Sequence, residues 1–221
     1  MLIDVVTDVR AVVGALEHDL TTLGQRMDQK VETLQMAASH FSGNDLEMMA
    51  NGIGALKEWT GKASARVVYD SRVDPFTDDG LFNKVKGRTN IALVGFTTDG
   101  DVCGGFYSVA VTRQKDHFFD PNIFAFSFES HGRCMTPQRF AVKEGVKEKM
   151  NVRYWPKNLH GFVSIGWTGG FTLGNEATDA WCCRMSHEFE GLADTTMTGK
   201  NGTWREGPYH NCTRLVAFEL S

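Results

Sequence analysis

The chain has 221 residues, of which 42% are hydrophobic and 23% charged, and its formal net charge is −4. This composition is typical of a globular protein and argues against a largely disordered one. The small acidic excess disfavours a nucleic-acid-binding protein, and no uncharged apolar stretch reaches the roughly 18 residues of a membrane-spanning helix. The five cysteines are an odd number, and no basic patch precedes an apolar run near the start. We therefore expect a cytoplasmic protein without a secretory signal, membrane insertion or a disulfide framework.

Residues 1–41 contain no proline and predict one long helix. Alternating steps of four and three from Leu2 meet apolar side chains at nine of ten positions, and Lys30 is the tenth. This is the heptad repeat of a coiled coil, in which apolar residues every 3.5 positions keep one face toward a partner helix. The predicted oligomerisation seam consists of Leu2, Val6, Val9, Val13, Leu16, Leu20, Leu23, Met27 and Leu34. We expect the chain to form a homo-oligomer through this helix.

The residues that flank the seam leave alternatives open for this helix. The positions that flank the seam include apolar Ile3, Val5, Val12 and Val31, so few charges specify the number or direction of the strands. The same apolar excess is compatible with an amphipathic helix that packs on its own domain. A strict 3.5 repeat over nearly five heptads favours the coiled coil, because an ordinary surface helix follows a period of 3.6.

Residues 42–64 predict a second helix followed by a linker. The sequence Phe-Ser-Gly-Asn at 41–44 interrupts the first helix, and Asn44 or Asp45 can cap a new one. Leu46, Met49 and Ile53 then repeat at intervals of three and four over residues 45–59. This segment either extends the seam after a hinge or folds back on it.

From residue 65 to 221 the pattern becomes rich in β-structure. The predicted strands cover residues 66–69, 90–97, 102–111, 123–130, 162–167, 171–173, 180–184 and 213–220, with helices over 78–86 and 142–150. Asp99-Gly100 is typical of a tight hairpin, and Phe124, Phe126 and Phe128 alternate as in a half-buried strand. The expected fold class is α+β: an antiparallel β-sandwich flanked by short helices and preceded by the long N-terminal helix.

Five segments of residues 65–221 resemble the TLDc domain family, in the family's order. They are YDSRVDPFT at 69–77, NIALV at 90–94 leading to DVCGGFYS at 101–108, FAFSF at 124–128, GGFTL at 169–173 and VAFEL at 216–220. The resemblance implies a helix-flanked β-sandwich without agreed catalytic machinery. It also implies protection against oxidative stress and binding to a subunit of the vacuolar proton-pumping ATPase. We thus expect a non-enzymatic interaction module. Gly104-Gly105 within a strand predicts a bulge or a close approach of another segment.

Cysteine and histidine offer the main chemical alternative. A zinc site would draw on His131, Cys134, Cys182, Cys183, His187, His210 and Cys212, but their spacing matches no standard finger or ribbon. A cysteine nucleophile would need an activating histidine, such as His131 for Cys134 or His210 for Cys212. A thiol-based redox sensor or antioxidant is the second function considered, at Cys134 or Cys183, because an arginine adjoins each and can favour the thiolate.

Aspartates crowd the first turn of the β-rich part, at Asp70, Asp74, Asp78 and Asp79. A calcium site is conceivable there, but the spacing of an EF-hand and its closing glutamate are absent. Turn formation and helix capping explain these residues better. We expect no resident metal ion and no cofactor.

Overall fold

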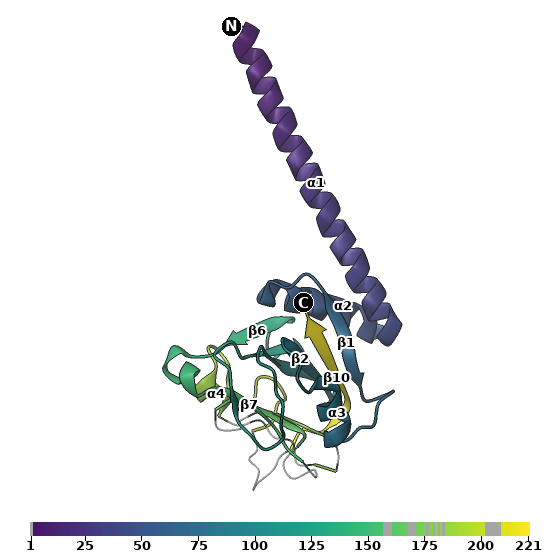
Figure 1. The fold of residues 1–221 in the computed structure, drawn as a ribbon, viewed down its shortest axis with the longest axis vertical. Helices are drawn as coiled ribbons and strands as arrows, with labels where there is room; N and C mark the ends of the chain where they lie inside the picture. The colour runs from purple at the N-terminus through teal and green to yellow at the C-terminus, as the bar shows by residue number, and fades with distance from the viewer. Residues whose placement is uncertain are drawn as a thin grey trace. The chain divides into compact units, whose positions relative to one another are not determined.

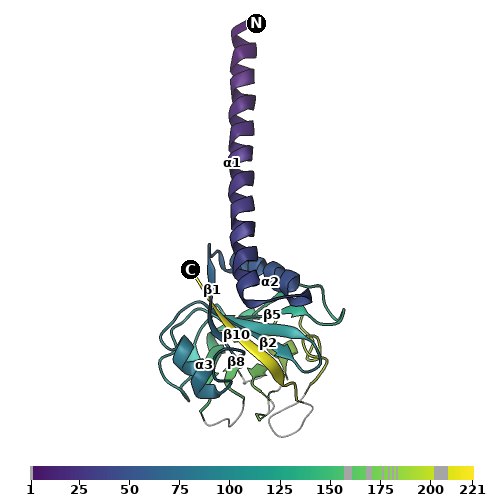
Figure 2. The same ribbon diagram turned by 90° about the vertical axis from the view of Figure 1, so that its right-hand side faces the viewer.

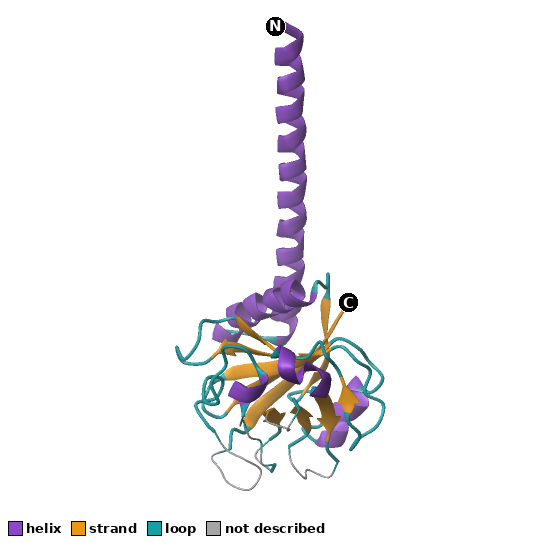
Figure 3. Cartoon of the chain, turned by 90° about the vertical axis from the view of Figure 1, so that its left-hand side faces the viewer, coloured by secondary structure: helices purple, strands orange, loops and turns teal. Residues whose placement is uncertain are grey.

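The computed structural model describes residues 2–156, 161–167, 171–175, 177–178, 180, 182, 184–201 and 209–221, with side chains from Arg10 onward. The chain divides into two compact units, Met1–Gly54 and Ala55–Ser221. Figure 3 shows that helix makes up the first unit and that the strands belong to the second. The division falls within a helix, earlier than the boundary near residue 65 expected from composition.

The first unit begins with α1 (Leu2–His40), which is continuous over 39 residues and therefore about 58 Å long. Figure 2 shows it without interruption. α1 ends before Gly43, whose φ of 60° lies in the left-handed region that glycine adopts readily. α2 (Asn44–Thr60) begins directly after this break, so it is not a straight extension of α1. The long helix and the break are both as the sequence predicts.

The larger sheet of the second unit has six antiparallel strands. Their order is β1 (Ala65–Asp70), β10 (Cys212–Leu220), β2 (Ile91–Thr97), β3 (Val102–Tyr107), β5 (Phe124–Glu129) and β6 (Gln138–Ala141). The C-terminal strand β10 thus lies between β1 and β2, as Figure 1 shows. The β2–β3 connection is the predicted hairpin, and Gly100 adopts a φ of 86° in its turn.

The smaller sheet has four antiparallel strands, and short helices accompany the two sheets. The strand order is β4 (Phe118–Phe119), β7 (Asn151–Tyr154), β8 (Val163–Ile165) and β9 (Phe171–Leu173). The helical segments are α3 (Asp78–Val85), the 3₁₀ helix η1 (Glu144–Lys149) and α4 (Met185–Glu188). The predicted α+β class with two antiparallel sheets and a long N-terminal helix is confirmed. None of the helices in these described ranges has the length and apolarity needed to span a membrane.

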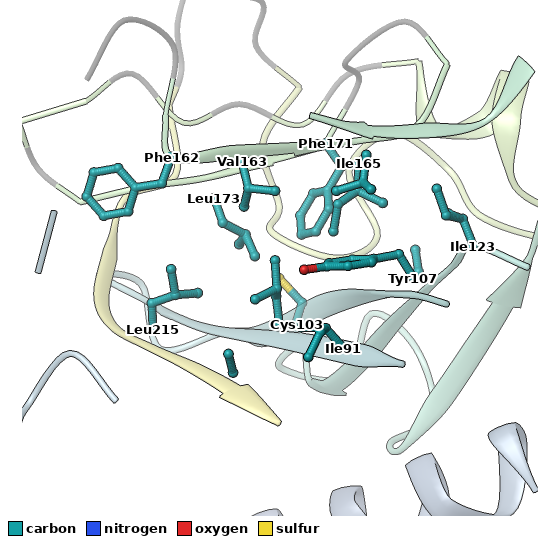
Figure 4. Close-up of a cluster of buried hydrophobic side chains, with 14 of the residues drawn as sticks. Ile91, Cys103, Tyr107, Ile123, Phe162, Val163, Ile165, Phe171, Leu173 and Leu215 are labelled. Carbon is teal, nitrogen blue, oxygen red and sulfur yellow. The ribbon is translucent and has the colours of Figure 1, made fainter. Parts of the chain in front are cut away.

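The hydrophobic core lies between the two sheets. Figure 4 shows Cys103, Tyr107 and Leu215 of the larger sheet facing Ile165 and other side chains of the smaller one. The hydroxyl groups of Tyr107 and Tyr154 lie 2.8 Å apart across this interface. The two polar atoms therefore satisfy each other within an apolar layer.

Two adjacent glycines of β3 allow close packing on both faces of the larger sheet. A Cβ on Gly104 would lie 2.7 Å from the ring of Phe126 and still closer to the carbonyl of Leu93. A Cβ on Gly105 would lie 2.7 Å from Cδ1 of Ile165 in the smaller sheet. The sequence-based prediction of a close approach at Gly104-Gly105 is confirmed, and the reason is steric.

The phenylalanine-rich strand β5 is buried on both faces, so the expectation of a half-buried strand is wrong. The ring of Phe124 stacks on Phe106 at 4.9 Å, and the ring of Trp59 lies 6.0 Å from Phe124. Aromatic side chains thus cover the side of β5 that is turned away from the smaller sheet. Alternation predicted which residues share a face, but coverage of the second face depends on residues remote in sequence.

Other differences concern short or irregular segments. β3 ends at Tyr107 rather than 111, and the helix predicted over 142–150 is the 3₁₀ helix η1. No strand forms over those residues of 180–184 that the structure describes, where Cys182 makes an isolated bridge to Phe171. The short strands β4, β6 and β7 were not predicted from the sequence. Strands of two to four residues carry too little periodicity to be recognised.

Candidate functional site

The most conspicuous surface feature of the first unit is a run of large apolar side chains along α1. Their exposed fractions range from 46% at Val13 to 68% at Leu20. The members are Val12, Val13, Leu16, Leu20, Leu23, Met27, Val31 and Leu34. Single exposed apolar residues are common on proteins, but a contiguous row of them marks an interaction surface. We call these eight residues the apolar face of α1.

The apolar face coincides with the predicted seam wherever side chains are described. Val13, Leu16, Leu20, Leu23, Met27 and Leu34 all lie on it, while Leu2, Val6 and Val9 are placed only as helical backbone. The helix brings these residues together because positions three and four apart lie on one side of it. Val12 and Val31 widen the face at flanking positions.

Two glycines within α1 do not interrupt the helix. Gly14 and Gly24 have no described heavy atom within 4 Å of the position a Cβ would occupy, apart from neighbouring backbone of the helix itself. Thr21 and Thr33 satisfy their hydroxyl groups locally by donating to the carbonyls of Glu17 and Gln29, each at 2.8 Å. These two hydroxyl groups are thus satisfied by backbone of the helix itself.

The proposed redox residue Cys134 is half-buried and hydrogen-bonded within its own turn. Its Sγ lies 3.0 Å from the Ser130 hydroxyl, and its backbone N–H donates to the same oxygen at 3.1 Å. The guanidinium of the adjacent Arg133 donates instead to the carboxylate of Asp101 and to the Thr196 carbonyl, the latter at 3.1 Å. The Arg133 guanidinium therefore hydrogen-bonds to these groups, and not to the Cys134 thiol as the sequence suggests. Cys183 lies outside the described residues.

His131 does not activate Cys134 either. Its Nδ1 lies 2.9 Å from Oδ1 of Asp101, a side chain that is 2% exposed, and its backbone N–H donates to Glu129. Such an Asp–His pair can orient a general base. Among the described residues, however, no thiol or hydroxyl is hydrogen-bonded to this imidazole. Asp101 instead joins Arg133 and His131 to the β2–β3 hairpin, which is a structural arrangement.

The other described cysteines are buried, and two of them have strongly perturbed thiols. Burial raises the pKa of Cys103 well above its ordinary value, and the nearby Cys212 and Cys182 raise this pKa further. Burial raises the pKa of Cys212 to about 12, although a hydrogen bond of this thiol with the backbone of Gly174 lowers it. These thiols are therefore protonated and inert at neutral pH.

Several of the residues considered as metal ligands have other partners. His210 hydrogen-bonds through Nε2 to the Thr172 carbonyl at 2.9 Å, and its ring stacks on Phe171. Asp70 pairs with Arg214, and Asp74 pairs with Lys84 at 2.7 Å. In the described part of the chain, no group of three or more histidine, cysteine or acidic side chains could hold a metal ion.

We expect the buried thiols to resist alkylation. At pH 8, iodoacetamide should modify Cys212 roughly a thousandfold more slowly in the native protein than in urea, because the thiolate fraction falls tenfold for each unit of pKa above the pH. Cys103 should also react more slowly in the native protein, because burial raises its pKa. Mass spectrometry of the digested protein measures each rate. Cys134 serves as the internal comparison, and equal native and urea rates at Cys212 would contradict the predicted protection.

Comparisons with known proteins add no family to this description. No model of a protein family matches the chain, and no curated protein sequence is significantly similar to it. The TLDc resemblance stays a prediction that depends on the five sequence segments. The apolar face of α1 is the feature with the clearest functional consequence.

Proposed function

We propose that this protein is a non-enzymatic interaction module that self-associates by pairing α1 with the same helix of a second copy. The apolar face of α1 supports the proposal, because six of its residues occupy seam positions and are largely exposed in the single chain. Pairing would remove these side chains from water, and full burial of one leucine contributes about 1.5–3 kcal/mol.

The heptad pattern of the seam favours a second copy of this chain as the partner that binds the apolar face of α1. In a coiled coil, each apolar side chain of one helix fits a hole between four residues of the other, which requires the same 3.5-residue repeat on both. A copy of α1 provides that repeat by definition. The apolar positions of α1 keep this spacing across Gly14 and Gly24, over a helix of 39 residues.

The experiment compares two double variants of the full chain by sedimentation equilibrium. Leu16→Lys with Leu23→Lys places charges in the seam, whereas His18→Lys with Gln25→Lys adds two lysines at the same seven-residue spacing on the outer face. We expect the wild type and the outer-face variant to be oligomers. The seam variant should sediment as a monomer of 24.6 kDa, with a dissociation constant raised at least roughly a thousandfold. A monomeric wild type, or equal masses for the two variants, would overturn the proposal.

Self-association would give the second unit avidity for a partner, because binding of one copy brings its neighbour close to the next site. The TLDc resemblance points to a cytoplasmic role in protection against oxidative stress and to a vacuolar ATPase subunit as that partner. In a pull-down from cell extract, the wild type should retain more of this subunit than the seam variant does. Recovery from neither protein would speak against this partner.

A thiol-based redox sensor is the alternative function, and no contact of the described cysteines favours it. The guanidinium beside Cys134 binds Asp101, and burial raises the pKa of Cys103 and Cys212. We therefore do not propose it as the main role.

A further inference from the structure

The second unit contains a groove of about 380 Å³ whose chemistry differs from that of the chain as a whole. It lies beside the last residues of α2, over β3, β5 and β6, and its volume is within the range of ligand pockets. Its residues come from six separate segments between Trp59 and Lys147. Both apolar and cationic side chains line it.

Stacked aromatic rings that are themselves buried lie beneath the groove. Phe106 and Phe124 stack at 4.9 Å, and Ile123 adjoins them. The guanidinium of Arg139 lies over the Phe124 ring at 4.4 Å and donates through one nitrogen to the Trp59 carbonyl at 3.3 Å. This stacking holds the planar cation at the groove and leaves further N–H donors for a ligand.

Three cations line the groove: Lys62, Arg139 and Lys147. No carboxylate is among the described residues that line the groove, although the chain carries a net charge of −4. Lys62 has no ion pair within the described ranges, and Lys147 reaches only Glu144, at 3.6 Å and on the surface. Arg139 donates to the Trp59 carbonyl in the last turn of α2, and this helix capping explains the position of Arg139 alone. It does not explain why two lysines from other segments share the same groove.

Polar groups on one side of the groove form hydrogen bonds with one another. The buried carboxylate of Asp120 accepts hydrogen bonds from the Ser108 hydroxyl and from the backbone N–H of Asn122, both at 2.9 Å. The side-chain amide of Asn122 donates to the Ser108 hydroxyl at 3.1 Å. Asp120 is not among the described residues that line the groove, and its oxygens accept hydrogen bonds from these donors.

We propose that this groove binds an acidic peptide segment of a protein partner, with carboxylates of the segment at Arg139, Lys62 and Lys147. Charge complementarity carries the choice of ligand, because three cations without a lining carboxylate attract an anion. The three cations come from three separate segments along the groove, which favours a peptide with several carboxylates over a single free anion. The inference rests on the proposed interaction role and names the chemistry of the partner.

The test uses the full chain and a fluorescein-labelled hexaglutamate peptide, followed by fluorescence anisotropy. Lys147→Glu should weaken binding roughly tenfold or more, because it replaces an attraction by a repulsion. Lys149→Glu is the matched control: it makes the same charge change on η1, but Lys149 lies over the ring of Trp167 at 4.1 Å, outside the groove. The control should bind as the wild type does. Arg139→Gln, which removes the charge from a second segment, should also weaken binding.

Three results would overturn the proposal: no binding of hexaglutamate, equal weakening by Lys147→Glu and Lys149→Glu, or equally tight binding of a single-stranded oligonucleotide or inorganic phosphate. The seam variant Leu16→Lys with Leu23→Lys separates this inference from the self-association proposal. If that monomer binds hexaglutamate with the wild-type intrinsic affinity, the groove acts independently of α1. If the wild type oligomerises but no protein binds the peptide, only the groove proposal fails.

Discussion

Replacement of Asp70 by asparagine is expected to lower the free energy of unfolding by about 3–5 kcal/mol, because it leaves a buried arginine without its counter-charge. The Asp70 and Arg214 side chains are 5% and 2% exposed. Nε of Arg214 donates to one carboxylate oxygen at 3.0 Å, and its second nitrogen donates to the other oxygen. The pair connects β1 to the C-terminal strand β10, so its loss should weaken attachment of an edge strand.

An exposed ion pair between the same two strands provides the control. Arg66 of β1 pairs with Glu219 of β10, and the Arg66 side chain is 68% exposed. Arg66→Ala should cost less than about 1 kcal/mol, as is usual for surface pairs. The double variant Asp70→Leu with Arg214→Met should recover much of the stability lost in Asp70→Asn, because it removes both buried charges. Urea unfolding of the full chain, followed by tryptophan fluorescence, measures all four proteins. Equal losses for Asp70→Asn and Arg66→Ala would contradict the prediction.

Acidification from pH 6.5 to 4 is expected to remove roughly 3 kcal/mol of stability through one side chain, His210. Burial lowers the pKa of this imidazole from 6.5 to about 4. Nε2 carries the proton that bonds to the Thr172 carbonyl, and Nδ1 has no hydrogen-bond partner among the described residues. A second proton would therefore place a charge in an apolar site without an acceptor.

The direction of the effect follows from proton binding. Between pH 6.5 and about 4, the unfolded chain binds a proton at His210 and the folded chain does not, so acid favours unfolding. The contribution is fully present above pH 6.5 and is lost as the pH falls through this interval. His210→Gln keeps a donor for the Thr172 carbonyl but cannot titrate, so its stability should depend less steeply on pH. The exposed His18→Gln is the control, and the same pH dependence in all three proteins would contradict this assignment.

Local sequence patterns predicted much of the secondary structure. The 3.5-residue repeat and the lack of proline predicted α1, because helical neighbours are only three and four residues apart. Asp99-Gly100 predicted the β2–β3 hairpin, because its turn needs a positive φ that glycine adopts without strain. In each case the residues that determine the element are close together in the chain.

The side-chain environment was harder to predict. Arg133 adjoins Cys134 in the sequence, but its guanidinium reaches Asp101 and the Thr196 carbonyl. The reason is that Asp101 is buried and needs donors, and the fold brings the two loops together. Proximity in the chain was thus a poor guide to the chemistry of a thiol.

The sequence by itself determined the long helix, its apolar seam and the alternating strands, because these depend on the periodicity of local backbone geometry. Only the tertiary structure decided which cysteines are buried, that Asp70 meets Arg214, and that Lys62, Arg139 and Lys147 line one groove. Strand pairing creates these neighbourhoods, since antiparallel sheets place residues more than a hundred positions apart at contact distance. A local sequence pattern does not predict which distant residue will contact a given side chain.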